Sequence, residues 1–289
     1  MSPDPVPVRP AATVLLLRDS EAGVEVFMLR RNRESAFVGG VYVFPGGKVD
    51  PSDRDDPGLE EVCDGRDDAS CSSALGLGSG GLAYWVAAVR ECFEEAGVLL
   101  ATRDDAFVSL ADPTRAERFG GYRDLVYSGD LRLAELCRRE GLRLALDRVG
   151  YLSHWITPVG PPRRFDTRFF VAAVPPDQVP LHDGGETVAS EWIRPGEALR
   201  RHLAGEFDLI LPTIRNLEDV ARFETVDEVM ADVAVRRDIR AITPRIVREG
   251  SGIRVIEPGR PGYDEAAARA PTEGSVNEVP RPGSVTPPD

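Results

Sequence analysis

The stretch Arg90-Glu-Cys-Phe-Glu-Glu-Ala-Gly-Val98 carries the strongest structural signal in this sequence of 289 residues. It places three carboxylates on a predicted helix that ends at Gly97, because glycine readily adopts the left-handed conformation of a helix C-cap. On a helical wheel with about 100° per residue and Glu91 at 0°, Glu94 lies at about 300° and Glu95 at about 40°. The three acidic side chains therefore share one face of the helix.

The opposite face of this helix is apolar. Val86, Val89, Phe93 and Ala96 fall between about 140° and 220° on the same wheel, so this side is built to pack. Like charges at i,i+4 destabilise a helix, so a positive partner is expected against the acidic face. A divalent cation is the obvious candidate, because hard cations take carboxylate oxygens. An ordinary solvated acidic face is the alternative interpretation.

A second motif, Phe44-Pro-Gly-Gly-Lys-Val-Asp50, lies upstream. Together the two stretches resemble the box of the Nudix hydrolases, G-x5-E-x7-R-E-U-x-E-E-x-G-U, in which U is aliphatic. The second half fits from Arg90 to Val98, with cysteine at the first U position, and Gly47 serves as the opening glycine. Asp53 stands where the box has Glu, and either it is an auxiliary acid or, as we favour, a turn residue beside Pro51.

The two halves of the box are split by an insert. Thirty-six residues (54–89) precede Arg90, where the box has seven. The extra residues, about 54–81, are acidic and rich in Ser and Gly, with no sustained apolar period. We interpret them as a surface excursion.

The resemblance implies an α/β fold, a Nudix α/β/α sandwich with a mixed β-sheet. The expected organisation is a flexible N-terminus (1–9), a Nudix hydrolase domain (10–249) and a mostly disordered Pro/Gly-rich tail (250–289). Within the domain we expect the insert at about 54–81 and a C-terminal helical extension at about 196–240.

Secondary-structure patterns agree with a mixed α/β order. A β-hairpin is predicted from 12–17 and 24–30, followed by a strand at 41–44 and the helix at 82–96. Further helices are predicted at 113–119, 121–127, 131–140, 212–223 and 226–237, and further strands at 151–157, 165–174 and 188–193. The last helix begins with a capping box, Thr225 to Glu228.

The resemblance also implies roles for individual residues. Glu91, Glu94 and Glu95 would hold Mg²⁺ or Mn²⁺, with Gly46 lending a backbone carbonyl. Arg90, Gly47 and Gly97 would support the site, Arg90 by orienting a glutamate or the glycine loop. The family usually adds a later carboxylate as a ligand or general base. Glu186 is favoured for this role over Asp183 and Glu191.

The substrate prediction rests on Trp155-Ile-Thr-Pro158 and on Arg163-Arg-Phe-Asp-Thr-Arg-Phe-Phe170. Both resemble a branch of the family that splits its box with an insert and includes peroxisomal coenzyme A diphosphatases. Arg163, Arg164 and Arg168 would then bind the 3′-phosphorylated ADP moiety by bidentate contacts, unless they merely face solvent.

The expected activity is hydrolysis of coenzyme A or acyl-coenzyme A to 3′,5′-ADP and (acyl-)4′-phosphopantetheine. The alternatives are cleavage of NADH, ADP-ribose or a nucleotide sugar, and a non-catalytic domain that senses a nucleotide. The expected partner is a small nucleotide; a homodimer is left open.

Composition limits the other classes of function. A net charge of −13 argues against a general binder of nucleic acid or membrane surfaces, which favour basic patches. No apolar run approaches the ~20 residues of a membrane span. The four cysteines are too scattered for a disulfide framework or a zinc site. The N-terminus does not resemble a secretory signal and the C-terminus is not a peroxisomal tripeptide, so we expect a cytoplasmic protein.

Overall fold

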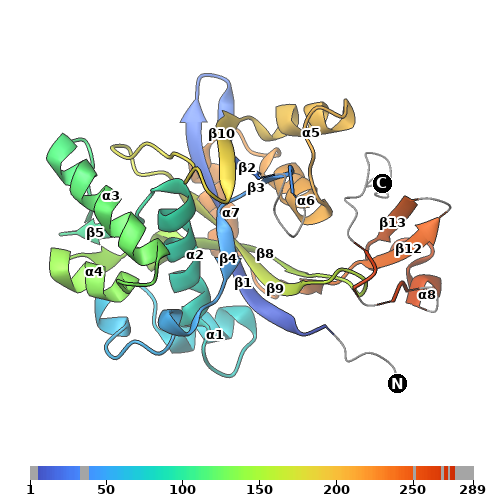
Figure 1. The fold of residues 1–289 in the computed structure, drawn as a ribbon, viewed down its shortest axis with the longest axis horizontal. Helices are drawn as coiled ribbons and strands as arrows, with labels where there is room; N and C mark the ends of the chain where they lie inside the picture. Colours follow the sequence, from blue (N-terminus) through green and yellow to red (C-terminus); the bar gives the residue numbers. More distant parts are fainter. Residues whose placement is uncertain (1–5, 33–38, 250–251, 268–269, 273, 277–289) are drawn as a thin grey trace.

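The computed structural model describes residues 6–32, 39–249, 252–267, 270–272 and 274–276. Their principal sheet has eight strands and lies between two layers of helices, so the predicted α/β/α sandwich with a mixed sheet is confirmed (Figure 1). Residues 1–5 of the predicted flexible N-terminus and residues 277–289 of the predicted tail lie outside the described residues.

The strand order of the principal sheet is β10-β2-β1-β9-β8-β11. β1 and β2 form the predicted antiparallel hairpin, whereas β1 and β9 run parallel, which makes the sheet mixed. The bounds are β1 Val8–Ser20, β2 Gly23–Arg31, β8 Gly150–Ile156, β9 Arg164–Ala173, β10 Thr187–Ile193 and β11 Ala241–Ile242.

One edge of β1 is shared between two partners. Its end pairs with β2, but its first half pairs with β4 (Gly46–Lys48), in the register Thr13 to Gly46 and Ala12 to Gly47. A further short strand, β3 (Tyr42–Val43), pairs with β2. The two glycines of the Phe-Pro-Gly-Gly motif are thereby fixed to the centre of the sheet.

The first helical layer is built around α2 (Leu82–Ala96), which ends at Gly97 in the left-handed conformation, as predicted. Every residue of α2 except Glu94 is buried. The alternative interpretation of an ordinary solvated acidic face is therefore wrong, because neighbouring segments cover both sides of the helix. Around it lie α1 Asp68–Leu75, α3 Pro113–Tyr127, α4 Leu133–Glu140 and a small sheet of β5 Ala101–Arg103, β6 Ala106–Phe107 and β7 Arg143–Leu144 (Figure 1).

The insert is part of this layer and not a surface excursion. It forms the 3₁₀ turn η2 (Glu60–Val62) and helix α1, and it buries apolar side chains in the core beside α2. Its elements are too short to produce a sustained period in the sequence. The buried residues are Leu59, Val62, Cys63, Cys71 and Leu75.

The insert also caps the central helix. Asp68 of α1 accepts hydrogen bonds from the backbone N–H groups of Gly80 (2.9 Å) and Leu82 (3.0 Å). The N-terminus of α2 has no cap from its own N-cap residue, Gly81. A carboxylate at this position satisfies free N–H groups and complements the helix dipole, so the insert stabilises the start of α2.

The second helical layer consists of α5 Pro195–Leu203, α6 Leu211–Val220 and α7 Val226–Val235. Leu217 of α6 and Val229 of α7 pack with Leu15 and Val171, on the face of the sheet that points away from α2. The helices predicted as an extension thus provide one layer of the sandwich. The predicted capping box of Thr225 and Glu228 begins α7.

Two further expectations differ from the structure. The helices predicted at 113–119 and 121–127 are one helix, α3, since Gly120 and Gly121 within it cost only about 1 kcal/mol each. The tail expected from residue 250 contains β13 (Gly252–Ile256), paired with β12 (Arg245–Glu249), and α8 (Tyr263–Ala266). Ile253, Val255 and Ile256 are buried, which accounts for this order.

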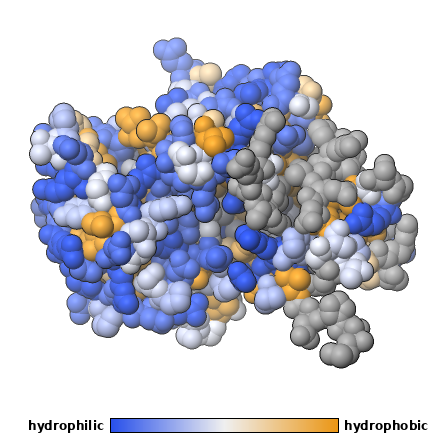
Figure 2. All heavy atoms as spheres, viewed as in Figure 1, coloured by the Kyte–Doolittle hydropathy of each residue, from blue (hydrophilic) through white to orange (hydrophobic). Residues whose placement is uncertain are grey.

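The face of the molecule in Figure 2 is mostly hydrophilic, with scattered apolar side chains. Among the described helices, none combines the length and the apolar character needed to cross a bilayer.

Candidate active site

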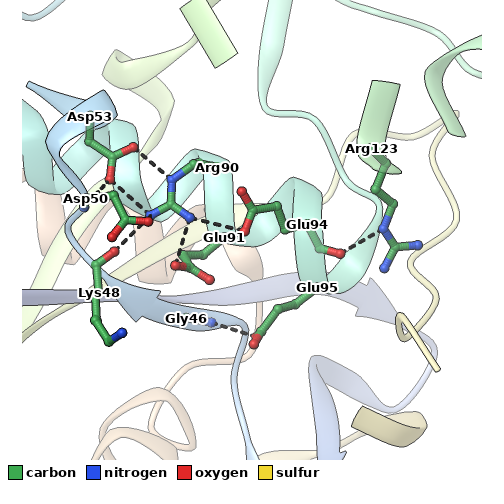
Figure 3. Close-up of polar contacts among 9 residues, drawn as sticks. All are labelled: Gly46, Lys48, Asp50, Asp53, Arg90, Glu91, Glu94, Glu95 and Arg123. Atoms are coloured by element: carbon green, nitrogen blue, oxygen red, sulfur yellow. Dashed lines mark hydrogen bonds and ion pairs between the residues drawn. The ribbon is translucent and has the colours of Figure 1, made fainter. Parts of the chain in front are cut away.

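Arg90 is the hub of a polar network at the C-terminal half of α2 (Figure 3). Its Nη1 donates to Glu91 Oε1 (2.9 Å) and to Glu94 Oε2 (3.1 Å). Its Nη2 donates to the carbonyl oxygen of Lys48 in β4 (2.8 Å). One guanidinium thus fixes two glutamates against the strand that carries the glycine motif.

Asp53 completes this network from the turn that follows the glycine motif (Figure 3). Arg90 donates from Nε to Asp53 Oδ1 (2.8 Å) and from Nη2 to Asp53 Oδ2 (3.0 Å), a bidentate pair. Asp53 is 1% exposed and lies in the 3₁₀ turn η1 (Pro51–Asp53). The backbone of Asp53 thus lies in a turn, as predicted, but the prediction did not include its ion pair with Arg90. Its place at the acidic position of the box was the available signal.

The two glycines allow the carboxylates to approach the sheet. A Cβ at Gly47 would lie 2.3 Å from Glu91 Oε1 and 2.6 Å from its Cδ, so any side chain there would displace the Glu91 carboxylate. The backbone N–H of Gly46 donates to Glu95 Oε2 (2.9 Å). The glycine motif therefore brings Glu91 and Glu95 directly against β4.

Burial of the glutamates changes their acidity. The pKa of Glu91 is raised to about 7, mainly by burial and also by the charge of Glu94, while Arg90 opposes the rise. Burial also raises the pKa of Glu95 well above its usual value, and the charge of Glu91 adds to this effect. The pKa of Glu94 is raised by burial as well. Two buried carboxylates and one partly buried carboxylate, beside the guanidinium of Arg90, leave negative charge that a bound cation would stabilise.

The donor set fits a hard divalent cation, since it consists of carboxylate oxygens. The described part of the chain nevertheless holds no ready-made cluster of three or more His, Cys, Asp or Glu ligands. The reason is visible in Figure 3: Arg90 draws Glu91 and Glu94 toward itself, whereas Glu95 turns to Gly46. Glu91 and Glu95 lie one helical turn apart and the charge of Glu91 raises the pKa of Glu95, so they are the candidate pair for holding a cation.

The end of α2 is held by α3. Arg123 donates from Nε to the carbonyl oxygen of Glu94 (2.8 Å) and from Nη2 to that of Leu181 (3.1 Å). Its guanidinium lies beside Gly97, where a Cβ would be 3.1 Å from Nη1. One turn further along α3, Tyr127 is about half-exposed; burial raises its pKa, and the charges of Glu186 and Asp183 add to this. No pattern in the sequence indicated a role for Arg123 or Tyr127.

Glu186 lies just before β10 and is half-exposed. Its carboxylate is 3.7 Å from Nη2 of Arg31, the last residue of β2. The side chain of Asp183 accepts hydrogen bonds from the backbone N–H groups of Glu186 and Thr187 (both 3.0 Å), which fixes this loop. The charge of Glu186 also makes a small contribution to the raised pKa of Glu95, so the two carboxylates lie within electrostatic range of each other.

The other candidate carboxylate, Glu191, pairs with Arg201 (3.2 Å) on α5, in the second helical layer.

The three arginines proposed for substrate binding have different environments. Arg163 is exposed and precedes β9, and Arg164 donates to the carbonyl oxygen of Thr157 (3.1 Å). Arg168 is buried, pairs with Asp166 and lies 5.4 Å from the ring centroid of Tyr84. Tyr84 is seven residues before Glu91, or about 10 Å along the helix. The three arginines thus differ in exposure and in partners, and their role in binding substrate stays a prediction.

Comparison with known proteins identifies the family. A model of the NUDT19 Nudix domain matches residues 65–220, which is more than half of the chain. The chain belongs to the Nudix family. The solved Nudix hydrolase of Alicyclobacillus acidocaldarius has a TM-score of 0.64 and 25% sequence identity, and the match covers 81% of this chain and 99% of that chain.

Curated relatives of this Nudix protein carry the name acyl-coenzyme A diphosphatase NUDT19. The Xenopus laevis protein is 24% identical over 241 residues, and the Homo sapiens protein is 26% identical over 245 residues. These matches cover 73% and 71% of this chain, respectively, but only 63% of each relative. The chain therefore spans less than two thirds of the length of these relatives.

Proposed function

We propose that this protein hydrolyses the diphosphate bond of coenzyme A or acyl-coenzyme A in the presence of Mg²⁺ or Mn²⁺. Water attacks one phosphorus, the P–O–P bond breaks, and the products are 3′,5′-ADP and (acyl-)4′-phosphopantetheine. The single observation that carries the proposal is the cluster of Glu91, Glu94 and Glu95, in which Arg90 holds the first two and the Gly46 N–H holds the third.

The roles of the residues follow from their contacts. Glu91 and Glu95 would hold the cation, with Glu94 and the carbonyl of Gly46 as further donors. When bound, the cation would screen the phosphate charge and lower the pKa of the attacking water. Arg90 keeps two of the carboxylates in place, and Gly47 leaves the space that Glu91 occupies.

Glu186 is proposed as a later ligand or as the general base. It belongs to a loop fixed by Asp183, it is open to solvent, and its charge acts on Glu95. A base must reach the water within about 3 Å, or through one further water, which a half-exposed side chain on this side of the site can do.

Coenzyme A is favoured as the substrate by the names of the curated relatives and by the split box. Arg163 remains available for the 3′-phosphate because it is exposed. Arg168 is buried and paired, so its proposed contact with substrate would need Asp166 to release it.

The test is product analysis by chromatography after incubation with equal concentrations of coenzyme A, NADH, ADP-ribose and a nucleotide sugar. Formation of 3′,5′-ADP and 4′-phosphopantetheine as the fastest reaction is expected. Faster cleavage of another substrate would overturn the assignment of coenzyme A but would agree with the proposed hydrolysis of a diphosphate bond. Tight binding of ADP-ribose without any product in Mg²⁺ or Mn²⁺ would indicate a sensor.

A further inference from the structure

Three arginines interact electrostatically with the site glutamates: Arg31, at the end of β2, Arg90 and Arg123. The hydrogen bonding of Arg31 differs from that of the other two. Arg90 is buried and engaged by three carboxylates and a carbonyl oxygen. Arg123 donates to two backbone carbonyl oxygens. The Nε of Arg31 is buried, and within the described ranges it has no hydrogen-bond partner.

The position of Arg31 is fixed by its backbone. It pairs with Thr187 of β10, and its N–H and C=O groups bond to Val41 and Gly40. Side chains alternate along a strand, and Leu29 packs in the core on the α2 side, so the side chain of Arg31 points to that side as well. Its charge lowers the pKa of Glu95, against the larger effect of burial. The guanidinium is thus directed toward the carboxylate site.

The ion pair of Arg31 is a loose one. Its Nη2 is 3.7 Å from Glu186 Oε2, which is longer than a hydrogen bond, and the Glu186 side chain is 54% exposed. The Arg31 side chain is 30% exposed, and its Nε is unsatisfied. The guanidinium would therefore gain hydrogen bonds by turning to an anion. Its planar fork matches the oxygens of a phosphate.

We propose that Arg31 binds the diphosphate of the substrate beside Glu91 and Glu95, and that its ion pair with Glu186 opens when it does so. This assignment rests on the proposed function, because it places a diphosphate in the carboxylate site. Arg31 would then have two roles. Its positive charge would bind the substrate, and Glu186 would be released from Arg31 only when an anion replaces it.

The test measures equilibrium binding of ADP and of adenosine by calorimetry in Ca²⁺, using the full chain. Arg31→Gln should weaken ADP binding by about tenfold or more and leave adenosine binding within about twofold. Arg31→Lys should give an intermediate loss, because it keeps the charge but not the fork. Arg30→Gln is the matched control, since Arg30 is adjacent and faces the other side of the strand.

The release of Glu186 is tested by a double-mutant cycle. Glu186→Gln should strengthen ADP binding in the wild-type background and not in Arg31→Gln. The assignment is overturned by equal losses in Arg30→Gln and Arg31→Gln, by an Arg31→Gln protein that binds ADP like the wild type, or by a wild type that binds ADP no more tightly than adenosine. Product analysis with coenzyme A tests the proposed function separately, because Arg31-dependent binding of ADP without cleavage would overturn only the hydrolysis.

Discussion

Asp53 and Arg90, which are 37 residues apart in the chain, form a buried bidentate ion pair at 2.8 and 3.0 Å. The pair joins the turn after the glycine motif to the helix that carries the glutamates. Through the same guanidinium it reaches Glu91 and Glu94, so it links the position of the loop to the position of the carboxylates.

Replacing Asp53 by Asn should destabilise the protein. The substitution removes one buried partner and leaves the Arg90 charge less well compensated, which should cost about 3 kcal/mol. Urea denaturation would measure this loss in the free energy of unfolding. Asp55→Asn, two residues along and exposed, is the control and should change little. Equal effects of the two substitutions would show that the Asp53–Arg90 pair has no special weight.

Gly47→Ala should reduce activity more than stability. The added Cβ would meet the carboxylate of Glu91 at 2.3 Å, so this side chain must move away from β4. A displacement of about 1 Å at a reacting centre can lower the rate about 100-fold. The kcat for coenzyme A hydrolysis and the thermal midpoint should be measured together. Gly78→Ala, where a Cβ meets nothing within 4 Å, should retain full activity.

Without metal, stability should fall as the pH rises. Burial raises the pKa of Glu91 to about 7, above its ordinary value of 4.5, so the folded state binds this proton more tightly than the unfolded state. The resulting stability is fully present below about pH 4.5 and is lost as the pH rises through about 7.

This pH effect is measured as the thermal midpoint between about pH 5 and 8, first in EDTA and then in Mg²⁺. Each kcal/mol lost should lower the midpoint by about 2 to 4 °C. The stabilisation by Mg²⁺ should grow with pH, since ligands must be deprotonated. Glu91→Gln should flatten the slope in EDTA; an unchanged slope would contradict the assignment to Glu91.

Asp68→Ala should loosen the start of α2. It removes the acceptor for the N–H groups of Gly80 and Leu82 and should cost about 1 kcal/mol, as for a lost N-cap. Hydrogen exchange at Leu82 should become faster. In contrast, Asp67→Ala removes the cap of α1 and should leave exchange at Leu82 unchanged. Similar exchange in the two variants would argue against capping across the insert.

The sequence predicts those features that depend on local pattern. The hairpin of β1 and β2, the C-cap at Gly97 and the capping box at Thr225 follow from period and residue type alone. The three glutamates on one helix were likewise apparent from spacing. Local pattern, however, does not say which neighbours cover a helix, so the burial of α2 was not foreseen.

Long-range contacts account for what the sequence did not reveal. The capping of α2 by Asp68 joins residues 12 and 14 positions apart across an insert without a clear period. The contacts of Arg123 with Glu94 and of Arg31 with Glu186 depend on how α3 and β10 are placed. Such contacts are set by the fold and leave no spacing rule in the chain.

We propose that the glutamates of α2 drive metal-dependent hydrolysis of coenzyme A. The most direct test of this claim compares the initial rate of 3′,5′-ADP formation by the wild type and by Glu95→Gln in Mg²⁺. We expect product from the wild type and a loss of about 100-fold or more in the variant, with the fold retained. A variant that keeps more than about a tenth of the wild-type rate would contradict the claim.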